Sequence, residues 1–242
     1  MGRSRHMMIK RAEKEEYEQI RSFYDEVIDG FAGRDYHPRW EKDVYPDPRE
    51  LRELLERGEL VTGKHDGRIV AVMALNHECN EGYSRFDWPT RAEKEEVFVI
   101  HMLAVLPSYG RRGLAKEMVQ YAIDTAAENG GKALRLDVLK GNLPANRLYE
   151  SFGFQKLYTL NLFYPDTGWT DFELYELNIE GEGSGSVIET GRKTYISIEP
   201  FGKFYPAEEY HQDYAVKNPE AFERELLESG RKNIDRKPRQ DR

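Results

Sequence analysis

The sequence has only one cysteine, Cys79, among its 242 residues. A single cysteine excludes an internal disulfide framework and a cysteine-rich metal site, and such scarcity is typical of a reducing compartment. The sequence also lacks any run close to the ~18 apolar residues that a membrane-spanning helix needs, and we expect no signal peptide. These absences predict a cytoplasmic protein that binds no metal and contacts no membrane.

Positive charge is scarce relative to negative charge. The formal net charge is -8, with 33% charged and 39% hydrophobic residues. A general nucleic-acid or membrane binder would present clustered Lys and Arg on a basic background. The composition therefore indicates a globular, heavily solvated protein that does not have nucleic acid as a partner.

The spacing of apolar residues predicts a mixed α/β (α+β) fold. Apolar positions at three- and four-residue steps predict helices, while alternating or continuous apolar runs predict strands. The Asp-Gly pair at residues 66–67 predicts a hairpin turn. We expect helices at about 17–30, 48–58, 113–129 and 144–152, and strands at about 8–11, 59–63, 68–76, 97–106, 133–139, 154–164 and 171–177.

Two segments of unusual composition bound the main part of the chain. The first seven residues have the character of an appended leader, with a natural start at Met7 or Met8. After Asn178, the run Ile-Glu-Gly-Glu-Gly-Ser-Gly-Ser has the composition of a flexible linker. We therefore predict a leader, a main domain, a linker and a C-terminal extension at residues 1–7, 8–178, 179–186 and 187–242.

A connection at residues 107–115 has the chemistry of an anion-binding site. It reads Pro-Ser-Tyr-Gly-Arg-Arg-Gly-Leu-Ala and joins the strand at 97–106 to a helix. Free N–H groups in a first helical turn attract a pyrophosphate, as does the positive end of the helix dipole. Arg111 and Arg112 add charge, and Gly113 allows close approach of the backbone. The run matches no Walker A or G-x-G-x-x-G motif, and alone it is equally typical of an ordinary basic connection.

A second motif lies at residues 142–154, which read Asn-Leu-Pro-Ala-Asn-Arg-Leu-Tyr-Glu-Ser-Phe-Gly-Phe. Pro144 is expected in the first turn of a short helix that has Ala145, Leu148 and Tyr149 on one face. A tyrosine on such a face presents its hydroxyl to a cleft or packs in the core. For an isolated tyrosine, the core is the more common place.

Together, and in this order, the two segments resemble the GNAT N-acetyltransferase superfamily. The resemblance covers about residues 8–177 and implies the acyl-CoA N-acyltransferase fold, in which helices cover both faces of a mixed, mostly antiparallel sheet. The family loop reads Q/R-x-x-G-x-G/A, and here residues 110–115 read Gly-Arg-Arg-Gly-Leu-Ala. Gly110 replaces a long polar side chain of the family, so we expect backbone amides to hold the cofactor.

The resemblance implies acetyl-CoA as the co-substrate, with its pyrophosphate on the helix-opening loop and its pantetheine near the second motif. The implied reaction is direct transfer of the acetyl group to a primary amine of a small molecule or peptide, within a ternary complex. The residues implied in cofactor binding are Leu103, Ala104, Val105, Arg111, Arg112, Gly113, Leu114, Ala115, Asn142 and Ala145.

Proton transfer is needed because a neutral amine must attack and a thiolate must leave. Tyr149 matches the family position proposed as the acid. His101 is the one titratable residue within the apolar strand and is the candidate base, with Glu96 and Asp137 as alternatives. A buried histidine is more often a hydrogen-bonded structural residue than a base, and a structural role for His101 therefore stays open.

Six aromatic residues in irregular segments either shape the acceptor pocket or anchor their loops. The sequence leaves open which amine is the acceptor and whether the chain forms a homodimer. The six residues are Tyr36, Trp40, Tyr45, Tyr83, Phe86 and Trp88.

The segment at about residues 194–235 resembles the C-terminal part of peptide methionine sulfoxide reductase A, through the run Ala-Glu-Glu-Tyr-His-Gln-Asp-Tyr at 207–214. That family needs a Gly-Cys-Phe-Trp nucleophile, whereas Cys79 lies in the other domain, so reductase chemistry cannot start. We expect this fragment to dock on the main domain, because its apolar residues would otherwise be exposed. Pairing with another chain and a relic of gene fusion are the alternatives.

Two other hypotheses compete with a GNAT enzyme. The first is a non-catalytic module that senses acyl-CoA, which the glycine at position 110 favours. The second is a remnant of a methionine sulfoxide reductase fusion, which the missing nucleophile disfavours.

Overall fold

The computed structural model describes residues 7–33, 38–164 and 166–179. All of them belong to the first of two units of the chain, Met1–Ser186, and the second unit, Val187–Arg242, lies outside the described residues. The predicted leader apart from Met7, the linker apart from Ile179, and the C-terminal extension therefore stay predictions. Tyr36 also lies outside the described residues.

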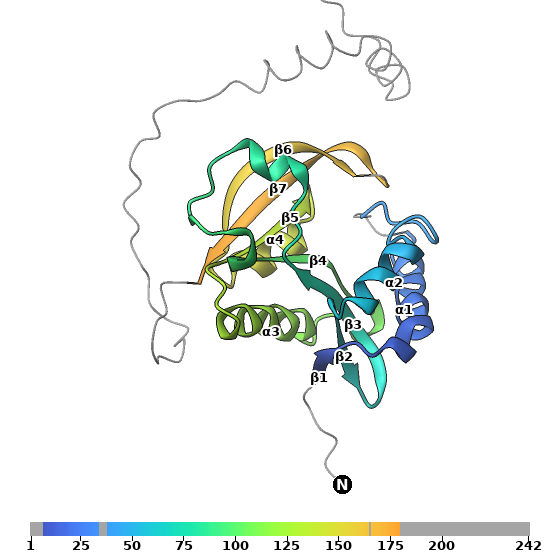
Figure 1. Ribbon diagram of the computed structural model, residues 1–242. Coiled ribbons are helices and arrows are strands. Elements are labelled where there is room, and N and C mark those ends of the chain that lie inside the picture. Colours follow the sequence, from blue (N-terminus) through green and yellow to red (C-terminus); the bar gives the residue numbers. More distant parts are fainter. Residues whose placement is uncertain (1–6, 34–37, 165, 180–242) are drawn as a thin grey trace, which may run out of the picture. The chain divides into compact units, whose positions relative to one another are not determined.

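A seven-stranded sheet forms the centre of the described unit (Figure 1), with the strand order β1-β2-β3-β4-β5-β7-β6. Every neighbouring pair is antiparallel except β4 and β5, which are parallel. The predicted mixed, mostly antiparallel sheet is confirmed. The strands are β1 (Met8–Arg11), β2 (Leu60–His65), β3 (Arg68–Asn76), β4 (Val97–Val105), β5 (Ala133–Leu139), β6 (Gln155–Tyr164) and β7 (Gly168–Asn178).

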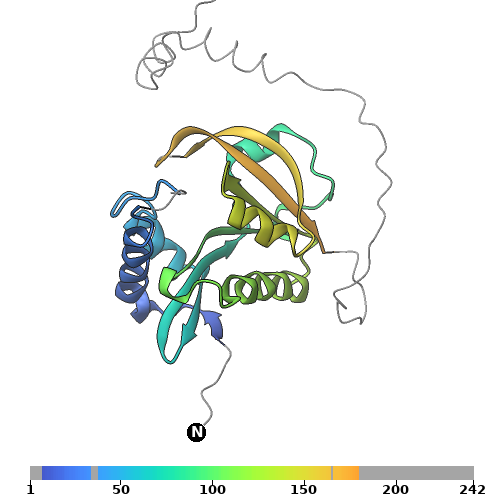
Figure 2. The same ribbon diagram turned by 180° about the vertical axis from the view of Figure 1, so that it is seen from behind.

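Helices cover both faces of this sheet. Figures 1 and 2 show α1 and α2 on one side, and α3 and α4 on the other. No helix in the described ranges is long and apolar enough to cross a membrane. The α-helices are α1 (Tyr17–Asp29), α2 (Pro48–Glu56), α3 (Leu114–Glu128) and α4 (Leu143–Glu150), and the 3-10 helices are η1 (Lys14–Glu16), η2 (Glu81–Arg85), η3 (Lys94–Glu96) and η4 (Pro107–Tyr109).

Short-range signals set several element ends. The Asp47 carboxylate accepts a hydrogen bond from the Arg49 amide at 2.7 Å, and this cap begins α2 with Pro48 in the first turn. Asp66 and Gly67 both have positive φ, of 49° and 78°, as a tight hairpin turn between β2 and β3 requires. One difference from the prediction is that β7 begins at Gly168, earlier than residue 171, so the turn after β6 is very short.

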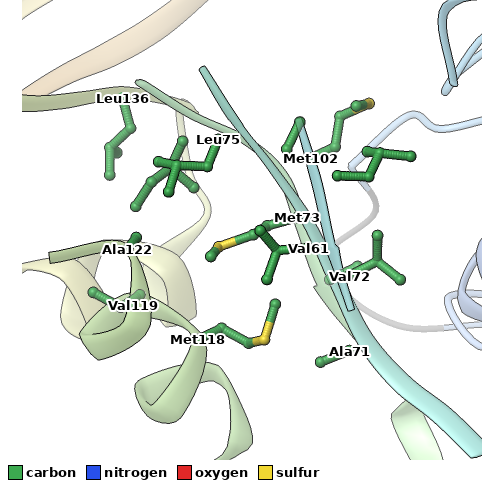
Figure 3. Close-up of a cluster of buried hydrophobic side chains, with 14 of the residues drawn as sticks. Val61, Ala71, Val72, Met73, Leu75, Met102, Met118, Val119, Ala122 and Leu136 are labelled. Atoms are coloured by element: carbon green, nitrogen blue, oxygen red, sulfur yellow. The ribbon is translucent and has the colours of Figure 1, made fainter. Parts of the chain in front are cut away.

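The core lies on both sides of β3 and β4. Figure 3 shows Met73 pointing toward Met118 and Ala122 of α3, while Val72 points to the opposite side of the sheet. Successive residues of a strand face opposite sides, so a central strand covered by helices on both faces is apolar throughout. This packing explains the nearly continuous apolar sequence of β4.

The parallel pair β4 and β5 stays together over only part of its length. Val97 pairs with Ala133, Phe98 with Leu134 and Val99 with Arg135, and the register ends there. Both strands continue beyond this point, β4 to Val105 and β5 to Leu139. The C-terminal halves of the two strands are thus neighbours in sheet order without a shared ladder.

Two methionines give a matched test of the core. Met73 is 0% exposed and Met8 is 60% exposed. We expect Met73→Ala to lower the free energy of unfolding by about 2–5 kcal/mol, because it removes buried volume from a close-packed core. Met8→Ala should change it by no more than about 0.5 kcal/mol. Urea unfolding measures both values, and equal effects would contradict this description of the core.

Candidate functional site

A cavity of about 140 Å³ lies where β4 and β5 part. Strand β4 and strand β5 each contribute consecutive residues to its wall, and α4, the α1–α2 loop and the β6–β7 turn complete it. The lining residues are Pro38, Trp40, Tyr45, Ile100, His101, Met102, Leu103, Asp137, Val138, Leu139, Asn142, Ala145, Tyr149, Tyr164, Asp166, Thr167 and Phe172. The cavity therefore brings together residues that are far apart in the sequence.

The hydrogen bonds of His101 define its tautomer. Its Nε2 lies 3.1 Å from Asn76 Oδ1 and 3.0 Å from the Glu78 carbonyl oxygen. Asn76 Oδ1 also accepts from the Glu78 amide, and Asn76 Nδ2 donates to Glu59, so the amide orientation is consistent with an acceptor facing the ring. Both neighbours of Nε2 are acceptors, and Nε2 must carry the proton. The lone pair of the neutral imidazole is then on Nδ1.

Burial lowers the pKa of His101, because the imidazolium would lose its hydration, although the charge of Asp137 opposes this shift. The imidazole is accordingly neutral at pH 7. A neutral imidazole with a lone pair on Nδ1 is able to accept a proton in the cavity wall.

Asp137 on β5 is bound by two tyrosines. The hydroxyl groups of Tyr83 and Tyr164 both donate to its Oδ2, at 2.8 Å and 2.5 Å. Burial raises the pKa of Asp137, while these two hydrogen bonds and the nearby His101 lower it. Donors to the ionised form allow a carboxylate to persist in a partly dry cavity.

Tyr149 on α4 is 6% exposed and lines the same cavity. Its ring packs against Phe154 and Tyr175, with centroid distances of 5.5 Å and 6.4 Å. Burial, and then the charge of Asp137, raise the pKa of the Tyr149 hydroxyl. That hydroxyl is thus protonated at neutral pH and able to donate.

A β-bulge shapes the wall beside His101. Two residues of β4, Met102 and Leu103, oppose the single residue Met73 of β3, because Ala74 pairs with His101 and Val72 pairs with Ala104. Such a bulge leaves an extra residue unpaired in the ladder and redirects the strand. The bulge lies in the part of β4 that lines the cavity.

Tyr24 on α1 supports the bulge. Its hydroxyl donates to the Met102 carbonyl oxygen at 3.0 Å, and its side chain is 2% exposed. Met102 has a φ of 53°, a left-handed conformation that costs roughly 1–3 kcal/mol in a non-glycine residue. The buried hydrogen bond helps to stabilise this conformation at the cavity wall.

The N-terminus of α3 lies directly after β4 and a short 3-10 turn. Gly113 is the N-cap, with a φ of 85°, and Arg111 also has a positive φ, of 61°. Within the described part of the chain, the amides of residues 111–115 have no backbone acceptor. Turns with left-handed residues ahead of a helix are typical of anion-binding concavities. The Arg112 guanidinium lies 4.8 Å above the Tyr109 ring and is exposed.

The predicted cofactor residues divide between two places. Leu103, Asn142 and Ala145 line the cavity, and Asn142 also caps α4 by accepting from the Ala145 amide at 3.2 Å. Ala104 and Val105 continue β4 from the cavity toward the α3 loop, which holds residues 111–115.

Several candidate residues lie outside the cavity wall. Glu96 forms an ion pair with Lys132 at 3.1 Å and is not a lining residue. Tyr83, Phe86 and Trp88 are in a second hydrophobic cluster next to β6 and β7, and Tyr83 reaches the site only through Asp137. The geometry thus favours His101 and Asp137 over Glu96.

The structure adds residues that the sequence did not single out. Tyr164 ends β6, Asp166 and Thr167 lie in the β6–β7 turn, and Pro38 and Phe172 also line the cavity. The only available signal was a polar Asp-Thr pair in a short turn, which is also ordinary turn composition. No group of three or more His, Cys, Asp or Glu residues in the described part of the chain is arranged to hold a metal.

A family model described as Acetyltransferase (GNAT) family matches residues 20–154, more than half of the chain. The chain belongs to the GNAT acetyltransferase family. The matched region contains β4, the α3 loop and α4, and hence most of the GNAT site described above.

Similarity to known proteins supports this GNAT assignment. The ribosomal protein bS18-alanine N-acetyltransferase of Escherichia coli (strain K12) is 37% identical over 65 residues, which is 27% of this chain and 44% of that protein. The match therefore spans less than half the length of that relative. A GNAT-family acetyltransferase of Streptococcus agalactiae superimposes with a TM-score of 0.59 and 20% identity, over 71% of this chain and 95% of that one.

A Salmonella typhimurium protein solved with its cofactor acetyl-CoA has a similar fold. Its TM-score is 0.54 at 15% identity, and the match covers 74% of this chain and 97% of that one. At this identity the likeness concerns the fold alone.

The C-terminal resemblance is also confirmed. A family model described as Peptide methionine sulfoxide reductase matches residues 183–242. The peptide methionine sulfoxide reductase MsrA 2 of Staphylococcus aureus (strain MW2) is 40% identical over 74 residues, which is 29% of this chain and 38% of that protein. The GNAT chain therefore continues into a segment related to part of a reductase.

The bond between Tyr24 and Met102 can be tested by removing one oxygen atom. Tyr24→Phe should lower the free energy of unfolding by about 1–3 kcal/mol, because it leaves the Met102 carbonyl buried without that donor. Tyr121→Phe on α3, where the tyrosine is half-buried, is the matched control and should change it by less than about 0.5 kcal/mol. Equal urea midpoints for Tyr24→Phe and the unaltered chain would contradict the proposed support of the bulge.

Proposed function

We propose that this GNAT chain is an acetyl-CoA-dependent N-acetyltransferase that acetylates a primary amine by direct attack, with both substrates bound together. The observation that carries the proposal is the cavity between β4 and β5, which His101, Asp137 and Tyr149 all line. Proton-transfer groups with shifted pKa values in a concave site are typical of catalytic centres.

The chain offers acetyl-CoA a fitting surface. The unbonded amides of residues 111–115 and the exposed guanidinium groups of Arg111 and Arg112 suit its pyrophosphate. Leu103, Asn142 and Ala145 line the route that leads into the cavity. Gly110 carries no side chain to contribute, so the backbone donors have the main role. When bound, acetyl-CoA supplies an acetyl group activated as a thioester.

Tyr149 is suited to the acid role. Its hydroxyl stays protonated in the buried wall, and no hydrogen-bond partner holds it among the described residues. A donor in that position can protonate the departing thiolate. The raised pKa of Tyr149 also means that its hydroxyl regains a proton readily after each turnover.

His101 is suited to the base role. Its Nδ1 carries the lone pair because Nε2 donates to Asn76 and Glu78. Asp137 lies near enough for its charge to act on His101 and is held by two tyrosines. We assign Asp137 to the attraction of the protonated amine, and His101 to the removal of its proton.

A thiol-release assay tests the proposal. The full chain is mixed with acetyl-CoA and a panel of polyamines, aminoglycosides, amino acids and peptides, and CoA is detected by its thiol. Acceptor-dependent release of CoA is the expected result. Tight acetyl-CoA binding in calorimetry without release across the panel would contradict the proposal and support a non-catalytic acyl-CoA sensor.

Replacement of Tyr149 by phenylalanine should slow CoA release by about tenfold or more while acetyl-CoA affinity stays nearly unchanged. The physical reason is that the substitution removes only the donor. Tyr175→Phe is the matched control, because Tyr175 packs beside Tyr149 but does not line the cavity. Steady-state kinetics and calorimetry give the two quantities, and unchanged turnover would remove Tyr149 from the mechanism.

The pH dependence of kcat/KM should report His101. Burial lowers its pKa in the folded protein below the ordinary histidine value of 6.5, so the neutral base is lost only as the pH falls through that lower value. We expect an acidic limb with a midpoint below 6.5. His101→Gln should abolish this limb and lower kcat/KM by roughly 10²–10⁴. The control His65→Gln should keep the acidic limb of the kcat/KM profile. An acidic limb that is still present in His101→Gln would exclude His101 as the base.

A further inference from the structure

Aromatic side chains line the outer end of the cavity. Trp40 and Tyr45 come from the loop between α1 and α2, and Tyr164 and Phe172 come from the β6–β7 pair. The Trp40 and Tyr45 rings pack together, with centroids 5.6 Å apart. Aromatic walls provide apolar surface for a hydrocarbon chain and negative ring faces that attract a cation.

Carboxylates supply the charge in this cavity. Asp137 and Asp166 both line it, and no lysine or arginine among the described residues does so. Negative charge in a concave, partly dry site attracts a positively charged ligand and disfavours a carboxylate. The cavity wall therefore selects its ligand by charge as well as by shape.

The Asp166 carboxyl and the hydroxyl of its neighbour Thr167 are polar groups that a ligand could bind. Burial raises the pKa of Asp166, and only backbone amides of the turn oppose that shift. The Thr167 hydroxyl oxygen is buried and has no hydrogen-bond partner in the described part of the chain. Buried polar atoms normally have a partner, so this part of the cavity wall is suited to a polar ligand group.

The carboxylates form two separate negative centres. The inner centre is Asp137, whose charge acts on His101. The outer centre is Asp166 of the β6–β7 turn, which lines the cavity. Its charge also acts on Glu50 of α2, since burial and then the charges of Asp47 and Asp166 raise the pKa of Glu50. A ligand that satisfies both centres needs two positive groups.

Tyr45 lines the same cavity as both carboxylates. Burial, and then the charges of Glu50, Asp166 and Asp137, raise the pKa of its hydroxyl. The charges of the inner and the outer carboxylates therefore both act on Tyr45. Its ring and that of Trp40 offer the apolar surface that connects the two places.

The Tyr149 hydroxyl is a second sign of a ligand at the inner centre. The side chain is more than nine-tenths buried, lines the cavity, and has no hydrogen-bond partner among the described residues. The Tyr149 hydroxyl can therefore donate or accept a hydrogen bond to a ligand in the cavity. This observation does not depend on the acidic residues.

We propose that the acceptor is a small aliphatic diamine or polyamine, with one primary amine beside Asp137 and His101 and a second ammonium group at Asp166, where the charge of Glu50 adds to the attraction. This inference rests on the proposed transferase function. In the reaction the new bond joins the amine nitrogen to the acetyl carbon, and the bond from that carbon to sulfur breaks. The ammonium group gives its first proton to His101 and attacks as a neutral amine, and the departing thiolate takes the proton of Tyr149. The nitrogen loses a second proton as the amide forms, and this proton restores the Tyr149 hydroxyl. The second ammonium group is unchanged and serves only to bind.

Three acceptors that differ only at their far end test the inference. They are 1,5-diaminopentane, 1-aminopentane and 5-aminopentanoate, which share the reacting amine and the chain length but carry a positive, neutral or negative end. With the full chain and saturating acetyl-CoA, kcat/KM should fall in that order. The diamine should exceed the monoamine by about tenfold, the size expected for one hydrogen bond to a charged group.

Variants locate the second ammonium site. In Asp166→Asn, the ratio of kcat/KM for 1,5-diaminopentane to that for 1-aminopentane should fall about tenfold. Asp124→Asn on α3 removes the same charge at an exposed residue that does not line the cavity, and it should preserve the ratio. Because Asp166 lies in a tight turn and the variant could misfold, Glu50→Gln on the exposed side of α2 provides a second measurement with a change in the same direction.

The outcomes separate the two proposals. CoA release at equal kcat/KM for the three acceptors would overturn the diamine inference and leave the transferase function standing. The diamine inference would also be overturned if the ratio of kcat/KM for 1,5-diaminopentane to that for 1-aminopentane were the same in Asp166→Asn, Glu50→Gln and the unaltered chain. Absence of release with these acceptors and with the wider panel would overturn the transferase function and the inference together.

Discussion

The site depends on how far β4 and β5 remain paired. The parallel ladder runs from Val97 to Val99 on β4 and ends there, although both strands continue. The cavity takes the place of the missing part of the ladder. If the pairing continued, backbone hydrogen bonds would close the space between His101 and Asp137. A binding site within the sheet thus follows from a ladder that stops early.

Arg135 pairs with Val99 at the last position of the ladder, next to the point where the strands part. Its guanidinium donates to Glu176 of β7 at 2.9 Å and to the Thr90 carbonyl at 3.1 Å, and it lies 4.1 Å from the centroid of Trp88. A buried ion pair adds little net stability, but loss of one partner costs about 3–5 kcal/mol. The pair therefore helps to hold β5 against β7.

The sequence predicts the elements of this fold better than its site, because the signals for elements are local. The Asp47 cap and the Asp66-Gly67 turn act over two to four residues and are readable without tertiary structure. The bulge at Met102 depends instead on pairing with β3, and Asp137 receives Tyr83 and Tyr164 from segments 54 and 27 positions away. Tyr83 illustrates how far local sequence can be used for prediction. Its place in an aromatic loop suggests a pocket wall, but in the structure it reaches the site only by donating a hydrogen bond to Asp137.

Burial has opposite consequences for the two neighbours at the centre of the cavity. It lowers the pKa of His101, since the imidazolium would lose hydration, and it raises the pKa of Asp137. Two tyrosine hydroxyls oppose the rise at Asp137, whereas the acceptors around Nε2 leave His101 neutral with a free Nδ1. In the proposed reaction, an incoming ammonium group meets a carboxylate that attracts it and an imidazole that can take its proton. In that proposal the same dry surroundings prepare one group for binding and its neighbour for proton transfer.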